Sequence, residues 1–241
     1  MLRRVSVYGT MNKRDEFLAA ARSQINKGIY VWGGNGENLL TMSDPLAWIR
    51  KRETTKANAD RAIALFEKRE AAGIAPIQAF DCSGLVYWSQ KKANVGYGDL
   101  TANSYWKECE PVPQTEAGDL VFHHNGIKCV HVGIVNGDGW VIESMGRDDG
   151  VVLSHRKSGY WNKQGRLRKL KEYYDKDYQT VHMTGTLCLR KQGNKNAKLI
   201  GYARKGHDYP VIGRAETGWF QIIVGQKIGY ISNETKYTHL I

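Results

Sequence analysis

Apolar residues recur at helical spacing near the start of the chain. In residues 15–27 ("DEFLAAARSQINK"), Phe17, Leu18, Ala21 and Ile25 fall on one side of a predicted helix. Two acidic residues open this segment and a Lys-Gly pair closes it, as is typical of helix ends. The three glycines of "YVWGGNGE" then predict a break in regular structure.

A second helical pattern, rich in charge, covers residues 44–72. Asp44 can cap its N-terminus, Pro45 suits the first helical position and Gly73 marks its end. The pattern predicts a helical pair inserted at about 36–79. An ordinary amphipathic hairpin on the surface is the simpler interpretation of the same residues.

After a third predicted helix at about 82–93, the apolar period changes to two. Four short runs follow, "GDLVFHH", "KCVHVGIVN", "GWVIESM" and "GVVLSH". The turn sequence Asn136-Gly137-Asp138-Gly139 is a strong hairpin signal between the second and third runs. A helix followed by an antiparallel meander indicates an α+β domain. The polar residues 163–177 predict a connector.

From Tyr178 onward, short strands and turns predict a small all-β barrel. This segment carries nine Lys and Arg residues against three Asp and Glu. The predicted organisation is a first domain over residues 1–172, which includes the helical insertion, and a second domain over residues 178–241.

The 241 residues carry a formal net charge of +11, and the pI is about 9.4. Such a charge favours anionic partners. Nucleic acid and an anionic bacterial wall are candidates, and a well-solvated basic surface is the plain alternative. No apolar run approaches the length of a transmembrane helix. The first residues show no apolar signal-peptide region.

Four cysteines occur without a CxxC pair, and a chain of this size does not need disulfide bonds, so we expect mostly free thiols. Cys82 lies where the third helix is predicted to begin, in "FDCSGLVYW". Exposed N–H groups and the helix dipole stabilise a thiolate at such a position. The other three are Cys109, Cys129 and Cys188.

Two residues of the predicted hairpin could act with this thiol. His131 alternates with Val130 and Val132, so its side chain points to the face opposite theirs. Such a histidine fits either a site or a hydrogen-bonded core position. Glu143 lies across the hairpin, where a carboxylate would fix the imidazole tautomer and favour the imidazolium. A glutamate facing water from an edge strand is the alternative.

Two rival sites are weaker. His123, His124, Cys129 and His131 could bind zinc together with Cys82. Strand alternation, however, sends His123 and His124 to opposite faces. The "GGNGE" segment lacks the Lys-Ser/Thr that follows a phosphate-binding loop. We therefore expect no metal and no cofactor.

Five segments occur in an order that resembles the NlpC/p-sixty family of bacterial cell-wall cysteine peptidases, over roughly residues 15–155. The resemblance implies a papain-like domain with Cys82 as nucleophile and His131 as general base. Glu143 falls on the third polar position, where many relatives have a histidine. The segments are "YVWGG" (30–34), "FDCSGLV" (80–86), "AGDLVF" (117–122), "HVGIV" (131–135) and "VIESMG" (141–146).

The same resemblance implies three substrate-binding residues. Tyr30 matches the tyrosine of a Y-x-x-G-G segment that approaches the site. Asp81 and Ser83 flank the cysteine, at positions that in some relatives hold the free amine of a wall stem peptide. Capping of the helix is an equal alternative for Asp81.

The C-terminal segment resembles a bacterial SH3-like domain through "LCLRKQ", "GYARKGHDYPVIG", "GWFQI" and "GYIS". In relatives such modules bind cell-wall peptides and target the enzyme. Tyr209, Trp219 and Tyr230 could form an aromatic recognition surface. Packing inside the barrel is the alternative, for Trp219 above all.

The resemblance implies a thiol protease that cleaves peptidoglycan stem peptides between D-Glu (or D-iso-Gln) and the diamino acid. It would act at the bacterial cell wall as a monomer, either as a phage lysin or as a host wall-remodelling enzyme, without a nucleic-acid or membrane partner. The alternatives are an N-acetylmuramoyl-amidase or acyltransferase on the same scaffold, a non-catalytic wall-binding protein and a nucleic-acid binder. The insertion at about 36–79 is expected to reshape the substrate wall.

Overall fold

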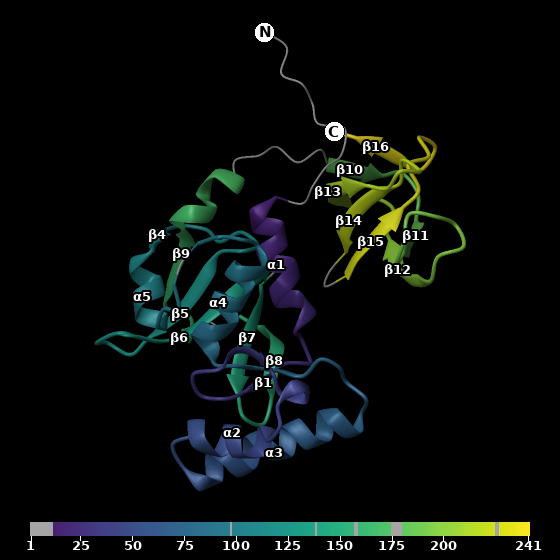
Figure 1. Cartoon of the computed structure of the whole chain (residues 1–241). Helices are drawn as coiled ribbons and strands as arrows, with labels where there is room; N and C mark the ends of the chain where they lie inside the picture. The colour runs from purple at the N-terminus through teal and green to yellow at the C-terminus, as the bar shows by residue number, and fades with distance from the viewer. Residues whose placement is uncertain (1–11, 97, 138, 157–158, 175–179, 225–226) are drawn as a thin grey trace. The chain divides into compact units, whose positions relative to one another are not determined.

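The chain folds into two compact units, which are described separately. The computed structural model describes residues 12–241 except 97, 138, 157–158, 175–179 and 225–226 (Figure 1). One unit covers Lys13–Tyr174, and the other holds the described residues from Thr180 to Ile241. Asp138 of the predicted turn and residues 175–177 of the predicted connector lie outside the described residues.

The larger unit is built around a six-stranded sheet with the strand order β4-β9-β5-β6-β7-β8. Every pairing in it is antiparallel. The four predicted runs form its four consecutive strands β5 to β8, because their alternating side chains can bury one face. The bounds are β4 Cys109–Pro111, β5 Leu120–His124, β6 Cys129–Gly137, β7 Trp140–Gly146, β8 Gly150–His155 and β9 Lys163–Leu167.

Three helices pack on this sheet through one apolar core. The fully buried Phe122, Val132 and Ile142 of the sheet share a core cluster with residues of all three helices. α4 contacts β6 and β7, and α1 packs against α4 (Figure 1). The helices are α1 Lys13–Ser23, α4 Cys82–Lys92 and α5 Ala102–Lys107. No helix among the described residues is long and apolar enough to cross a membrane.

The prediction of a connector over residues 163–177 is wrong for its described part. Its first five residues form β9, which lies between β4 and β5, and Arg168–Tyr173 form the 3-10 helix η2. This polar segment can lie inside the sheet because its charges are paired. Arg166 Nε lies 2.9 Å from Oδ1 of Asp119, and the Asp119 side chain is fully buried. The position of β9 within the sheet therefore depends on paired charges and not on alternating apolar residues.

The inserted segment forms a second apolar core in the larger unit, so it is more than a surface hairpin. Figure 1 shows its two helices side by side beneath β1. Asp44 caps the first of them through a 2.8 Å bond from Ala47 N, as predicted. The core residues come from both helices and from the small sheet β1-β3-β2. The elements are β1 Ile29–Tyr30, β2 Asn35–Asn38, η1 Leu39–Thr41, α2 Pro45–Arg52, α3 Lys56–Ala71 and β3 Gln78–Phe80.

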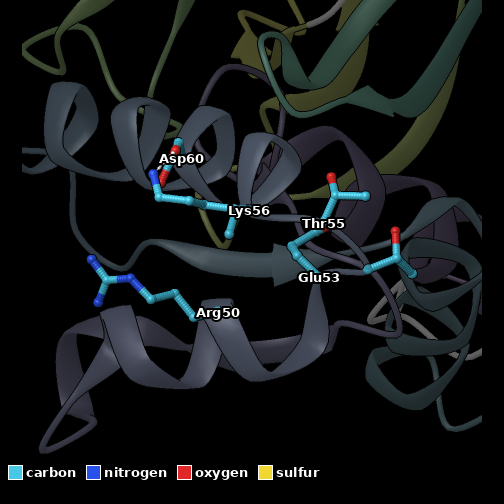
Figure 2. A pocket seen from close by; sticks show the side chains of 7 residues that line it. Arg50, Glu53, Thr55, Lys56 and Asp60 are labelled. Carbon is cyan, nitrogen blue, oxygen red and sulfur yellow. Dashed lines mark hydrogen bonds and ion pairs between the residues drawn. The ribbon is translucent and has the colours of Figure 1, made fainter.

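A cavity of about 470 Å³ lies at the link between the two inserted helices (Figure 2). Arg50 lines it from α2, and Lys56 and Asp60, which form an ion pair, line it from α3. None of the predicted site residues lines this cavity. Glu53, which also lines it, connects the insertion to the chemistry described below.

The smaller unit is all-β. Its strands form one seven-stranded antiparallel sheet in the order β12-β11-β15-β14-β13-β10-β16, with its own apolar core. No pairing between the described strands joins β12 to β16, so closure into the predicted barrel is not seen in the hydrogen bonds. The bounds are β10 Thr180–Met183, β11 Leu187–Arg190, β12 Leu199–Ala203, β13 Asp208–Arg214, β14 Phe220–Val224, β15 Lys227–Ile231 and β16 Thr238–Leu240.

Candidate active site

Cys82 is the first residue of α4, as its sequence context predicts. Asp81 caps the helix, because its Oδ1 accepts hydrogen bonds from Gly84 N at 2.7 Å and from Ser83 Oγ at 2.9 Å. The half-buried thiol therefore lies among the unpaired N–H groups of the first turn. The same local arrangement at Asp81 therefore caps the helix and places the sulfur at its N-terminus.

Close packing of a loop holds the start of α4 in place. Asp81 Oδ2 accepts a 3.0 Å bond from Gly33 N, and Asp81 N donates a 2.9 Å bond to Gly34 O. A Cβ atom at Gly84 would lie only 1.8 Å from that same Gly34 oxygen. Glycine at position 84 is therefore required by the approach of the loop. Because three donors already bind the carboxylate of Asp81, its capping and anchoring roles are clear from the contacts.

His131 and Glu143 lie on neighbouring strands of one hairpin. The register that pairs Ile134 with Ile142 puts Glu143 opposite Gly133, diagonally next to His131. His131 Nε2 lies 2.7 Å from Glu143 Oε2. A carboxylate can only accept, so Nε2 carries the proton and Nδ1 is left for the sulfur. The glutamate is buried, which excludes the alternative of an edge residue facing water.

The histidine is held in its charged form. Burial disfavours the imidazolium, but hydrogen bonds to Cys82 and Glu143 outweigh this effect and raise the pKa of His131 to about 9. The three predicted side chains therefore meet. A further bond explains how: Ser144 Oγ donates to Phe80 O at 3.0 Å, which ties β7 to the segment that enters α4.

Two more groups approach this centre. Ser154, on β8, donates a hydrogen bond to Oε1 of Glu143. Tyr30 is buried, and burial together with the negative charges of Cys82 and Asp81 raises the pKa of its hydroxyl group. The charge of Cys82 thus acts on Tyr30, whose role in substrate binding stays a prediction. Ser154 was not predicted, because the sequence does not reveal its diagonal position across β7 and β8.

An aromatic cover over the histidine was also missed. The ring of Trp161 stacks on that of His131, with 5.3 Å between centroids and 23° between planes. Tyr160 stacks on His123 at 4.4 Å, and His123 is the cross-strand neighbour of His131. Burial and the charges of Glu143 and Cys82 raise the pKa of Tyr160. The aromatic pair in "GYW" at 159–161 is a sequence signal for such a cover. It follows β8 along the chain, however, and the sequence does not show that this segment lies against His131.

The insertion reaches the site through one buried carboxylate. Glu53 accepts a 3.0 Å bond from Trp32 N and lies 2.7 Å from Arg147 Nη2. The guanidinium of Arg147 lies 4.7 Å from the ring centroid of Tyr30. The side chain of Glu53 is fully buried, so this ion pair fixes the loop after β1 to the turn after β7.

The three residues predicted for wall binding do not share one face of the smaller unit. Tyr209 packs against its apolar core, and its hydroxyl accepts a 3.1 Å bond from Arg204 N. Tyr230 alternates with the buried Gly229 and Ile231, so it lies on the other face. Trp219 is half-buried just before β14.

All four cysteines are free thiols, as predicted. Cys109 and Cys129 are buried, and burial raises the pKa of both thiols. Within the described residues, no group of three or more His, Cys, Asp or Glu side chains is arranged to hold a metal ion.

A thiol at a helix N-terminus that faces an imidazole on an antiparallel sheet is an arrangement of the papain-like α+β class. A family profile described as the NlpC/P60 family matches residues 27–168, and the chain belongs to this family.

Two relatives of this chain are named as endopeptidases. The chain is 40% identical over 94 residues to the bifunctional muramidase/DL-endopeptidase CwlT of Bacillus subtilis. The aligned region covers 37% of this chain and 28% of that protein. It is 31% identical over 97 residues to the murein DD-endopeptidase MepH of Escherichia coli, with 38% and 36% covered. The chain thus spans about a third of these relatives. The solved P60 domain of the M. avium subspecies paratuberculosis antigen MAP1204 is 23% identical, with a TM-score of 0.43 and coverage of 64% and 94%.

Proposed function

We propose that this protein is a cysteine endopeptidase that cleaves peptidoglycan stem peptides at the bacterial cell wall. The observation that carries the proposal is the 2.7 Å contact of His131 with Glu143, together with the hydrogen bond from His131 to Cys82. The family, and relatives named as endopeptidases, support the substrate class. The bond between D-Glu (or D-iso-Gln) and the diamino acid is the proposed site of cleavage.

The reaction is acyl transfer to water. The Cys82 thiolate attacks the amide carbonyl, and the imidazolium of His131 gives its Nδ1 proton to the leaving amine. A thioester on Cys82 remains. His131 then takes a proton from water, which attacks the thioester and releases the carboxylate product. The backbone N–H of Cys82, at the start of α4, stabilises the oxyanion in both steps. Glu143 keeps the ring oriented and its Nε2 protonated.

Digestion of defined stem peptides tests this function. The unmutated protein should release a fragment with a new amino terminus on the diamino acid, identified by its mass. Cys82→Ala should abolish the cleavage, whereas Cys188→Ala, the other half-buried thiol, should retain it. Release of free muramoyl groups instead would identify an amidase. Cleavage that persists in Cys82→Ala would overturn the thiol mechanism.

We further propose that the smaller unit is an SH3-like module that holds the enzyme on the wall. Its surplus of positive charge and the half-buried rings of Trp219 and Tyr230 support this role. Full-length Trp219→Ala and Tyr230→Ala should sediment less with purified walls but still cleave soluble peptides. Trp140→Ala, which removes an aromatic ring 40% exposed on β7 of the larger unit, is the matched control. Equal sedimentation of all three variants and the unmutated protein would contradict targeting by these rings.

A further inference from the structure

A polar stripe leads from the reactive sulfur along α4. Ser83, Tyr87 and Lys91 follow one another at intervals of four residues, so they lie on one side of the helix. Ser83 is next to Cys82, while Lys91 is in the last turn. The proposed catalytic chemistry uses only the first turn of this helix. The remainder of the stripe has no role in bond cleavage.

Tyr87 and Lys91 of this stripe, together with Trp88 and Lys92, form one wall of a cavity of about 440 Å³. The opposite wall comes from β2 and β3. Two lysines lie over aromatic rings here: Lys91 Nζ is 5.7 Å from the ring centroid of Tyr87, and Lys92 Nζ is 5.3 Å from that of Trp88. The lining also includes Asn35, Glu37 and Gln78.

Asn35 lies between the cavity, which it lines, and the first turn of α4. An added Cβ atom at Gly84 would lie 2.7 Å from Asn35 Oδ1, so this side chain packs directly on the turn that carries Cys82. Asn35 Nδ2 also donates to Asp99 Oδ2 at 2.7 Å, and Gln78 Nε2 donates to Gly36 O at 2.9 Å. Both lining amides are thus held in place by hydrogen bonds.

The groove has the chemistry of a carbohydrate site. The half-buried ring of Tyr87 offers an apolar surface, while amides, a carboxylate and ammonium groups supply donors and acceptors for hydroxyl and acetamido groups. A purely cationic site would suit phosphates instead, but Glu37 lines the groove beside the lysines. The mixed lining therefore favours a neutral sugar.

The spacing also fits. At about 1.5 Å per residue, Tyr87 lies roughly 7 Å and Lys91 roughly 13 Å along the helix axis from Cys82. Two extended residues span up to about 7 Å. A sugar joined to the scissile bond through two amino acids would therefore reach the Tyr87 end of the groove.

We propose that the groove along α4 binds the N-acetylated glycan that carries the stem peptide, and so selects glycan-linked peptides over free ones. This inference rests on the proposed function, since it assigns the substrate's sugar to a second part of the same site.

Binding to the full-length Cys82→Ala protein tests the inference without turnover. Calorimetry would compare a soluble stem peptide with the same peptide bearing its disaccharide. We expect the disaccharide to tighten binding at least about tenfold. Tyr87→Ala and Lys91→Ala, each added to Cys82→Ala, should remove most of that gain. Trp140→Ala, an exposed ring on β7, and Lys68→Ala, an exposed lysine on α3, should retain it.

Because Tyr87 also packs against the apolar core, the melting temperature of its variant must be measured, and the surface variant Lys91→Ala gives the independent reading. Equal affinity for the two ligands would overturn the inference, as would a gain that survives in Lys91→Ala and in folded Tyr87→Ala. Failure of the proposed function is a separate result, seen when the unmutated protein cleaves neither ligand.

Discussion

Ser154 and Glu143 are joined by a hydrogen bond from the serine hydroxyl to Oε1 of the carboxylate. The other oxygen, Oε2, accepts from His131 at 2.7 Å. Each oxygen of this buried carboxylate thus has its own donor, which fixes the plane of the group and the direction in which the imidazole points. The arrangement satisfies the same physical need that a second histidine would meet at this position, and it adds a negative charge.

The Glu143→Gln substitution should reduce kcat by at least about tenfold without unfolding the protein. The amide has nearly the same shape as the carboxylate but lacks its charge, so the imidazolium loses one of the two groups that stabilise it. Peptide cleavage and circular dichroism on the same samples would measure the two effects. Ser154→Ala should give a smaller loss. Unchanged turnover in Glu143→Gln would make the glutamate a structural residue.

The activity should decline as pH rises through about 9. His131 has a pKa raised to about 9 by its hydrogen bonds to Cys82 and Glu143, which outweigh the effect of burial. Above that pH the ring has lost the proton that the leaving amine needs. A profile of kcat/KM between pH 6 and 10.5 would locate this alkaline limb, which Glu143→Gln should move to lower pH. A limb centred near 6.5, the ordinary value of histidine, would argue against the pairing.

The same shift predicts how stability changes with pH. The folded pKa of His131 lies above the unfolded value of about 6.5, so folding is favoured by proton binding. This contribution is fully present below about pH 6.5 and is lost as pH rises through about 9. Urea unfolding at several pH values would show it as a decrease in the free energy of unfolding, absent in His131→Gln.

Iodoacetamide at pH 6 should modify Cys82 before the other thiols. Cys82 is half-buried and hydrogen-bonded to a charged imidazole, whereas Cys109 and Cys129 are buried and burial raises the pKa of their thiols. Peptide mass mapping over time would follow each site, with the half-buried Cys188 as the internal comparison. Equal rates at Cys82 and Cys188 would contradict activation by His131.

The Gly84→Ala substitution should destabilise the larger unit by about 3 kcal/mol. The added methyl group would lie 1.8 Å from the carbonyl oxygen of Gly34, a backbone atom that also accepts from Asp81 N. In an exposed helix the same change would stabilise by up to about 1 kcal/mol, so the sign of the effect is diagnostic. Gly98→Ala, which meets no atom within 4 Å, is the control and should be nearly neutral. Both are measured by thermal unfolding.

Trp161 should act as a positioning residue for His131. Trp161→Ala removes the ring that stacks on the imidazole at 5.3 Å, so kcat should fall; because burial lowers the pKa of His131, the alkaline limb should move to higher pH. Trp161→Phe should rescue most of both effects. Trp140→Ala removes an exposed ring elsewhere and should change neither. A loss of activity with an unmoved pH profile would assign Trp161 to structure alone.

Much of the larger unit was predictable from local rules. Alternation of apolar residues identified β5 to β8, and the polar triplet around Cys82 identified the start of α4, because both features depend on neighbours along the chain. The order of five short segments identified the family, which the match over residues 27–168 confirms. The N-cap residue Asp44 and the proline after it, at the first helical position, likewise located the start of α2.

Contacts between distant segments were decided only by the tertiary structure. By itself, the sequence determined which residues can alternate, cap and turn, and hence the main helices and strands and the thiol that begins α4. It did not determine that Ser154 meets Glu143, that Trp161 covers His131 or that residues 163–167 complete the sheet. Those relationships depend on strand order and on buried charge pairs such as Arg166 with Asp119. Such pairing satisfies polar groups across long sequence separations, and no local pattern of apolar residues records it.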